Sequence, residues 1–169
     1  MEKLFILKLI GDKAVMASFA DGNVKTKEQF ESTVNMQSLR WNNGYPFAGF
    51  IIKDNSTDDI VGYEVIGNSG IRNQAEMAYL FSKAYHRSDK VKDVGYENAG
   101  ALCLEYGRNL YNSKSLVNQS FDQDKAKFEG GNLFSSVTAT ARDDNPGSYK
   151  ILEKLGFIYK EDRFMINYL

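Results

Sequence analysis

The chain has 169 residues and a formal net charge of −1, which fits one soluble globular domain over residues 1–169 and gives no reason to expect binding to nucleic acid or to an anionic membrane. One cysteine and one histidine exclude an intramolecular disulfide and argue against a His/Cys metal site or a conventional catalytic triad. The sequence shows neither a signal peptide pattern nor an apolar run long enough to span a bilayer, so we expect a cytoplasmic protein.

The chain begins with a predicted strand and two predicted helices. The apolar run from Leu4 to Ile10 predicts a buried strand. Residues 12–19 predict a short helix with Asp12 as its cap, and residues 28–41 predict a weaker helix, because its apolar side chains have only rough helical spacing. Trp41 near the end of that helix either lines an acceptor pocket or packs the helix against the sheet.

Three strands joined by short polar connections predict an antiparallel meander. They are expected over Phe47–Lys53, Ile60–Ile66 and Ala75–Ser82. Side chains alternate between the two faces of a strand, so Met77 and Tyr79 share one face of the third strand, and Glu76 and Leu80 share the other.

The second half of the chain predicts a crossover connection. A polar, basic loop at residues 85–94 leads into a helix from Gly95 to about Tyr111, which carries its apolar side chains on one face. A polar insertion at about residues 112–132 precedes a strand at Leu133–Ala141. A strand, a loop, a helix and a second strand in this order predict a parallel pair.

A second helix has clear end signals. Asn145 suits the N-cap, Pro146 the first helical position and Gly156 the stop, and two strand-like segments close the chain. We therefore expect an α/β fold with a mixed, mainly antiparallel twisted sheet and helices on both faces.

The junction at Gly95 is a candidate phosphate site. A loop that enters a helix from the end of a strand presents free N–H groups at the positive helix terminus, and glycine allows close approach of a phosphate. Lys90 and Lys92 add positive charge. An ordinary basic loop before a helix explains this pattern as well.

The segment NPGSYKILEKLGF, from Asn145 to Phe157, resembles the helix-and-turn signature of the GNAT superfamily of N-acyltransferases. The family pattern is Asn, two variable residues, Ser or Ala, and an apolar helix ending in Lys-Leu-Gly-Phe; Asn145, Ser148 and residues 154–157 match it. Residues 75–80 and 133–141 resemble the family's fourth and fifth strands, and residues 47–50 and 61–63 its second and third. The resemblance covers most of the chain and is closest to the ribosomal-protein-alanine acetyltransferase branch.

This resemblance implies transfer of an acetyl group from acetyl-CoA, without a metal, to a primary amine of a small molecule or a protein N-terminus by direct attack. The thioester would lie between the fourth and fifth strands, and the pyrophosphate would lie on the loop before the first crossover helix. The coenzyme would contact Leu80, Phe81, Ser82, Lys92, Val94, Gly95, Tyr96 and Asn145. Glu76 would act as the general base through water and Ser148 as the proton donor to the thiolate, with Tyr149 and Tyr159 as alternative donors.

Two positions depart from the family pattern. Glu97 replaces a small residue in the pyrophosphate loop, and Leu152 stands where many family members carry a tyrosine that acts as the general acid. These departures favour an alternative, a GNAT-like module that binds an acyl-CoA or another partner without catalysis. An unrelated α/β nucleotide-binding domain is a second alternative, and the meander argues against it. The sequence leaves a homodimer open.

Overall fold

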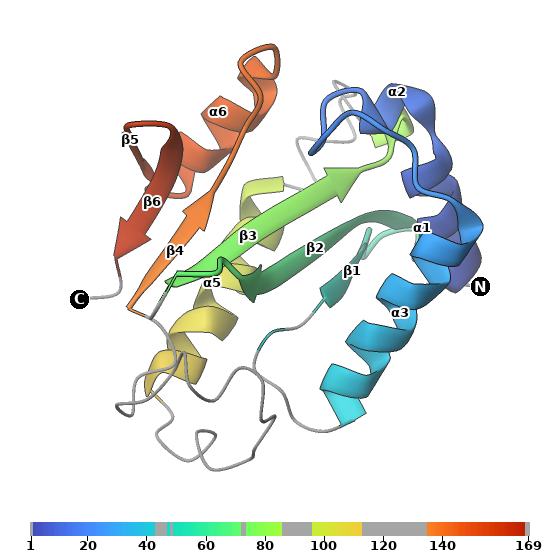
Figure 1. The fold of residues 1–169 in the computed structure, drawn as a ribbon, viewed down its shortest axis with the longest axis horizontal. Coiled ribbons are helices and arrows are strands. Elements are labelled where there is room, and N and C mark those ends of the chain that lie inside the picture. The colour runs from blue at the N-terminus through green and yellow to red at the C-terminus, as the bar shows by residue number, and fades with distance from the viewer. Residues whose placement is uncertain are drawn as a thin grey trace.

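A mixed six-stranded sheet with the strand order β1-β2-β3-β4-β6-β5 forms the centre of the molecule (Figure 1). The computed structural model describes residues 2–42, 47, 49–71, 74–85, 96–112 and 135–167. The strands are β1 (Gly49–Lys53), β2 (Ile60–Asn68), β3 (Gln74–Phe81), β4 (Ser136–Ala139), β5 (Ile158–Lys160) and β6 (Arg163–Asn167). β3 and β4 are parallel, and the other neighbouring strands are antiparallel, which confirms the predicted meander and crossover pair.

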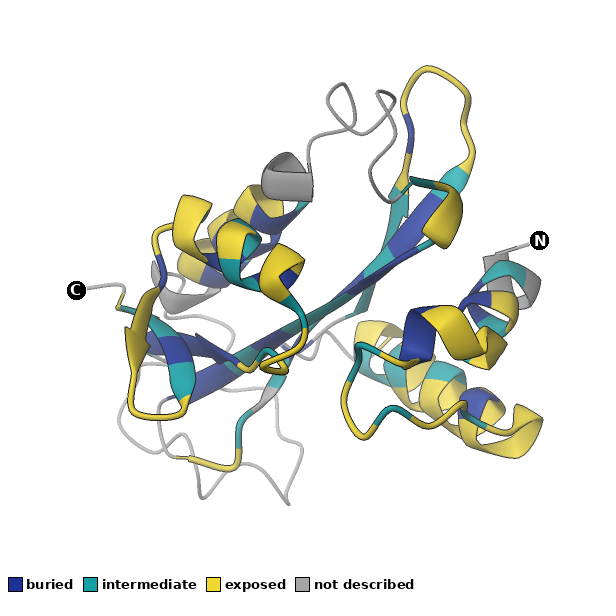
Figure 2. Cartoon of the chain, turned by 90° about the horizontal axis from the view of Figure 1, so that it is seen from above, coloured by how far each residue is buried: buried dark blue, intermediate teal, exposed yellow. Residues whose placement is uncertain are grey.

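Helices cover both faces of this sheet, as predicted (Figure 2). α1 (Glu2–Gly11), α2 (Lys13–Met16) and α3 (Lys27–Asn42) lie on one side, and α5 (Tyr96–Asn112) and α6 (Pro146–Lys154) lie on the other. A short 3-10 helix, Lys83–Tyr85, follows β3. The polar insertion expected at residues 112–132 lies outside the described residues, except that Asn112 ends α5.

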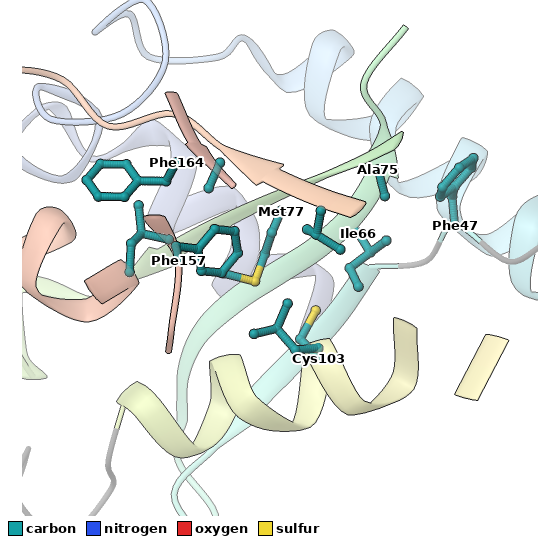
Figure 3. Packing of buried hydrophobic residues seen from close by; sticks show 11 residues of the cluster. Phe47, Ile66, Ala75, Met77, Cys103, Phe157 and Phe164 are labelled. Carbon is teal, nitrogen blue, oxygen red and sulfur yellow. The ribbon is translucent and has the colours of Figure 1, made fainter. Parts of the chain in front are cut away.

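The larger core lies between the sheet and the helices α5 and α6. Met77 from β3 and Cys103 from α5 are almost fully buried in it (Figure 3). Val137 from β4 and Leu152 from α6 are buried in the same core. Removing a side chain of this kind from water contributes about 1.5–3 kcal/mol. Cys103 is therefore a packing residue, as expected for a cysteine on the apolar face of a helix.

The smaller core corrects the prediction for the start of the chain. Leu4–Ile10 was expected to form a buried strand, and these residues belong to the helix α1. Ile6 and Leu9, three residues apart, form its buried stripe, and Leu9 packs with Val15 and Met16 against Leu80 of the sheet. A short run in which nearly every residue is apolar has no clear period, so it fits a strand or a helix equally well.

The cap signals in the sequence work as predicted. The Asp12 carboxylate accepts a hydrogen bond from the Ala14 N–H at 2.8 Å and caps α2. Asn145 caps α6, Pro146 opens it, and Gly156 ends it with a positive φ of 88°, which a side chain at this position would resist.

Trp41 packs the end of α3 against the sheet. Its indole Nε1–H donates to the Gly49 carbonyl oxygen at 3.1 Å, and its ring lies edge-on to Phe50 with the ring centroids 5.7 Å apart. Of the two roles left open for this residue, the structure shows the packing role.

Candidate functional site

The parallel strands β3 and β4 separate partway along their length. Their pairing runs from Gln74 opposite Ser136 to Glu76 opposite Thr138. Beyond that point β3 continues to Phe81, paired only with β2 in the described ladder, while the chain leaving β4 turns into α6. Figure 1 shows the two strands diverging. A cleft lies between β3 and the start of α6.

Two hollows with shared walls make up this cleft. One has a volume of about 540 Å³ and extends toward Lys83 and Ile151. The other has a volume of about 460 Å³ and extends along Glu76 and the segment Thr140–Arg142. Both are lined by Ser18, Phe19, Tyr79, Asn145 and Ser148. Each volume lies within the range of small-molecule and cofactor sites.

Asn145 joins the walls of the cleft. Its Oδ1 accepts a hydrogen bond from the Ser148 N–H at 3.2 Å, and its Nδ2 donates to the Ser18 carbonyl oxygen at 3.2 Å. The same side chain therefore fixes the first turn of α6 and holds α6 against the segment after α2.

Ser148 and Tyr79 form a hydroxyl pair at the shared wall. Their side-chain oxygens are 2.7 Å apart, and the Tyr79 hydroxyl also lies 3.3 Å from the Ser148 carbonyl oxygen. Burial raises the pKa of Tyr79 to about 12, the Ser148 hydrogen bond opposes this shift, and the Glu64 charge adds to it. Tyr79 therefore stays protonated at neutral pH.

The sequence did not single out Tyr79 as a site residue. The available signal was its place on the apolar face that it shares with Met77, because a buried tyrosine hydroxyl usually needs a partner. Which partner it finds depends on how α6 packs on β3.

The backbone of β3 also faces the cleft. The Ser82 N–H donates to the Val61 carbonyl oxygen in β2 at 2.9 Å. Backbone groups of successive residues in a strand point to opposite edges, so those of Tyr79 and Met77 point to the edge along the cleft. The Ser82 amide, one of the predicted coenzyme contacts, is instead directed at β2.

The structure brings several predicted site residues together. Leu80 and Phe81 line the larger hollow, Glu76 lines the smaller one, and Ser148 and Asn145 line both. The remaining predicted coenzyme contacts lie outside the described residues, namely Lys92, Val94 and Gly95. Tyr96 is the first residue of α5. For Tyr96 and Glu97 the structure describes the helical backbone and not the side chains.

The alternative proton donors lie elsewhere. The Tyr149 hydroxyl donates to Asp143 Oδ1 at 3.3 Å, the Tyr149 and Tyr159 ring centroids are 6.1 Å apart, and neither residue lines the two hollows. Leu152 is fully buried in the larger core, one turn after Ser148.

Among the described residues, no three His, Cys, Asp or Glu side chains gather in a way that could hold a metal ion. None of the described helices combines the length and the apolar character needed to cross a membrane.

Comparisons with known proteins show likeness at the level of the fold. No protein-family model matches the sequence, and no curated protein matches it. A solved GNAT-family acetyltransferase from Bacillus anthracis superposes with a TM-score of 0.64 and 17% identity, over 96% of this chain and 86% of that chain. Spermidine N-acetyltransferase from Vibrio cholerae, solved with CoA and spermine, gives a TM-score of 0.65 and 12% identity, over 98% of this chain and 89% of that one.

A third solved structure is the ribosomal α-N-protein acetyltransferase RimL in complex with coenzyme A. It has a TM-score of 0.63 and 14% identity, over 98% of this chain and 88% of that chain. The three likenesses are of similar strength, so they show the GNAT fold and do not single out the ribosomal-protein branch.

Proposed function

We propose that this chain, which has the GNAT fold, is an N-acetyltransferase that moves an acetyl group from acetyl-CoA to a primary amine. The observation that carries the proposal is the cleft where β3 and β4 separate. The start of α6 borders this cleft, and the hydroxyl pair of Ser148 and Tyr79 lies in the wall that its two hollows share. The proposal also draws on the acetyltransferases of the same fold whose solved structures contain CoA.

In this proposal the pantetheine arm of acetyl-CoA enters the larger hollow. Its amide groups pair with the backbone of Met77 and Tyr79 at the edge of β3, and its apolar parts contact Leu80 and Phe81. Asn145 keeps the start of α6 in place beside the cleft through its hydrogen bonds to Ser18 and Ser148. The pyrophosphate binds to the N–H groups at the start of α5, at Tyr96, and to the preceding Lys92, Val94 and Gly95.

The amine enters the smaller hollow and attacks the thioester carbonyl carbon. Glu76 accepts the proton of the attacking amine through a water molecule, the carbon–sulfur bond breaks, and the Ser148 hydroxyl donates a proton to the leaving thiolate. Tyr79 supports this step by donating its own hydrogen to the Ser148 oxygen, which leaves the serine hydrogen free to point at the sulfur. Positioning of the two reactants and general acid–base catalysis are the main contributions of such a site.

The acceptor is the primary amine of a small molecule or of a protein N-terminus. The sequence pattern of α6 favours the N-terminal amine of a ribosomal protein. A protein that binds acyl-CoA without catalysis is a second candidate, and it is favoured by the buried Leu152, which brings no hydroxyl to the cleft.

Thermal unfolding with acetyl-CoA, CoA and ATP tests the binding step. A ligand at ~100 times its Kd stabilises the native protein by about 2.7 kcal/mol. We expect acetyl-CoA and CoA to raise the Tm and ATP at equal concentration to leave it unchanged. Equal shifts from ATP and acetyl-CoA, or no shift from acetyl-CoA, would overturn the proposal.

Release of free CoA thiol in the presence of amines and of peptides with free N-termini tests the chemical step. Turnover with any of these acceptors supports the enzyme. Binding of acetyl-CoA without turnover on either class of acceptor would favour the second candidate.

A further inference from the structure

A second cavity lies on a different part of the sheet, between β1 with its following turn, β2 and α5. Its volume is about 520 Å³, and it shares no lining residue with the two hollows of the cleft. Its wall consists of Phe50, Ile51, Ile52, Lys53, Asp54, Asn55, Ser56, Glu64, Ala99, Leu102 and Cys103. The proposed acetyl transfer makes no use of this cavity.

Glu64 is a buried carboxyl group in the wall of this cavity. The residue lies in the middle of β2, is 2% exposed, and its Oε1 has no hydrogen-bond partner among the described residues. The carboxyl group as a whole has a hydrogen bond from the Cys103 thiol, which is a weak donor. A buried polar atom without a partner is costly, so a group that binds this oxygen would be strongly favoured.

The charges around the cavity favour a cation. The wall contains the carboxyl groups of Asp54 and Glu64 and one ammonium group, Lys53, whose Nζ lies 3.5 Å from Asp58 Oδ1. Asp54 Oδ1 accepts hydrogen bonds from Ser56 N at 2.8 Å and from Ser56 Oγ at 2.6 Å, which leaves that oxygen engaged in the turn. The deep carboxyl oxygen of Glu64 is therefore the best placed to receive a ligand.

The rest of the wall favours an apolar body. Phe50 and Ile52 lie on the same face of the sheet as Glu64, because Phe50 is directly opposite Glu64 in the ladder. Leu102 of α5 lines the cavity and is 67% exposed, so its side chain adds accessible apolar surface to the wall.

We propose that this cavity binds a small primary amine with an apolar body. The ammonium group pairs with the Glu64 carboxylate, and the apolar part packs against Phe50, Ile52 and Leu102. The site is separate from the proposed acceptor site, where an amine would lie near Glu76.

Proton linkage gives the pairing a signature. Burial raises the pKa of Glu64 to about 7, and the Cys103 hydrogen bond opposes this shift. Among the described residues, the other titratable or charged groups near Glu64 are Tyr79 on β3 and, in the cavity wall, Lys53 and the buried Asp54. An ammonium group favours the ionised carboxyl, so binding should release a proton and tighten by about tenfold between about pH 6 and about pH 8.

Benzylamine is the probe for this site, with benzyl alcohol and benzoate as matched compounds that lack the ammonium group. Titrations followed by NMR of the isotope-labelled full chain, without acetyl-CoA, locate the bound probe. We expect benzylamine to shift signals around Phe50, Glu64 and Leu102, and we expect Glu64→Gln to weaken it by about tenfold to a hundredfold. Glu153→Gln, the same change on the exposed face of α6, should leave the affinity unchanged.

A second variant protects the test against a folding defect in Glu64→Gln. Ala99→Phe fills the cavity from α5 and keeps the carboxyl, so it should also block benzylamine. Benzylamine binding with equal affinity to native protein and Glu64→Gln, binding only near Glu76, or no binding at millimolar concentration would each overturn the proposal. Tighter binding of benzoate or benzyl alcohol than of benzylamine would overturn it as well. These readouts need no catalysis, so they stand apart from the test of acetyl transfer.

Discussion

Replacing Glu64 by glutamine should change how the stability of the protein depends on pH. The native carboxyl is 2% exposed and lies between the sheet and α5. Glutamine has nearly the same shape and no charge in either state. The difference in unfolding free energy between the two proteins therefore isolates the titration of this one carboxyl.

The sign follows from the direction of the pKa shift. Burial raises the pKa of Glu64 from 4.5 to about 7, so between these values the native protein keeps a proton that the unfolded chain has lost. Stability from this group is fully present below about pH 4.5, falls as the pH rises, and levels off above about pH 7. A shift of this size corresponds to about 3 kcal/mol at 1.36 kcal/mol per pKa unit.

Urea unfolding of both proteins at about pH 5, 6, 7 and 8 measures this difference. Between the ends of the series the unfolding free energy of Glu64→Gln should rise by about 2.5 kcal/mol relative to that of the native chain, whatever its value at about pH 5. Glu153→Gln, at an exposed site, serves as the control and should show a nearly constant difference. A constant difference for Glu64→Gln would mean that the carboxyl is solvated or already paired, and it would remove the physical basis of the second cavity as an amine site.

Two further predictions concern the hydroxyl pair and the sheet. Ser148→Ala should lower turnover by ~10²-fold or more and Tyr79→Phe by roughly tenfold, with little change in the Kd of acetyl-CoA. Tyr149→Phe should change neither the turnover nor this Kd. Equal losses of turnover in all three variants would refute the role of Ser148 as the proton donor. Gly62→Ala should destabilise the protein by about 1–3 kcal/mol in urea unfolding, because a Cβ there lies 2.5 Å from the Leu80 carbonyl oxygen. Gly67→Ala in the same strand meets nothing closer than 3.9 Å, so a similar loss in both would show that lost glycine flexibility, and not the close contact, is the cause.

The parts of the fold that the sequence predicted are those set by local chemistry. The ends of α6 follow from Asn145, Pro146 and Gly156, each of which acts within its own turn of the chain. The meander follows from alternating strands and polar turns. The strand prediction for Leu4–Ile10 was wrong because contacts with residues distant in the sequence decide the structure of this segment. Leu80, against which it packs, lies some seventy residues away in the sequence.

The candidate site also divides into features set by a short local segment and features set by contacts between distant residues. Ser148 and Asn145 could be placed from a pattern in one short segment. The contact between Ser148 and Tyr79 joins residues 69 positions apart, and the burial of Glu64 depends on α5 covering β2. A glutamate in the middle of an apolar strand was a visible signal, but the sequence does not show whether such a residue faces solvent or a cavity.

The hydroxyl pair bears on the choice between an enzyme and a binding module. Residues four apart on a helix lie on nearly the same face, one turn from each other, and here the turn at Leu152 packs into the core while the turn at Ser148 reaches the cleft. A tyrosine at position 152 would therefore have to displace core side chains before it could donate to the cleft. In this chain a phenol comes from β3 instead, where Tyr79 contacts Ser148 at 2.7 Å. In the proposed mechanism, a phenol beside Ser148 supplies a protonated hydroxyl where the thiolate forms, so the absence of a tyrosine from α6 favours the binding module but does not by itself exclude catalysis.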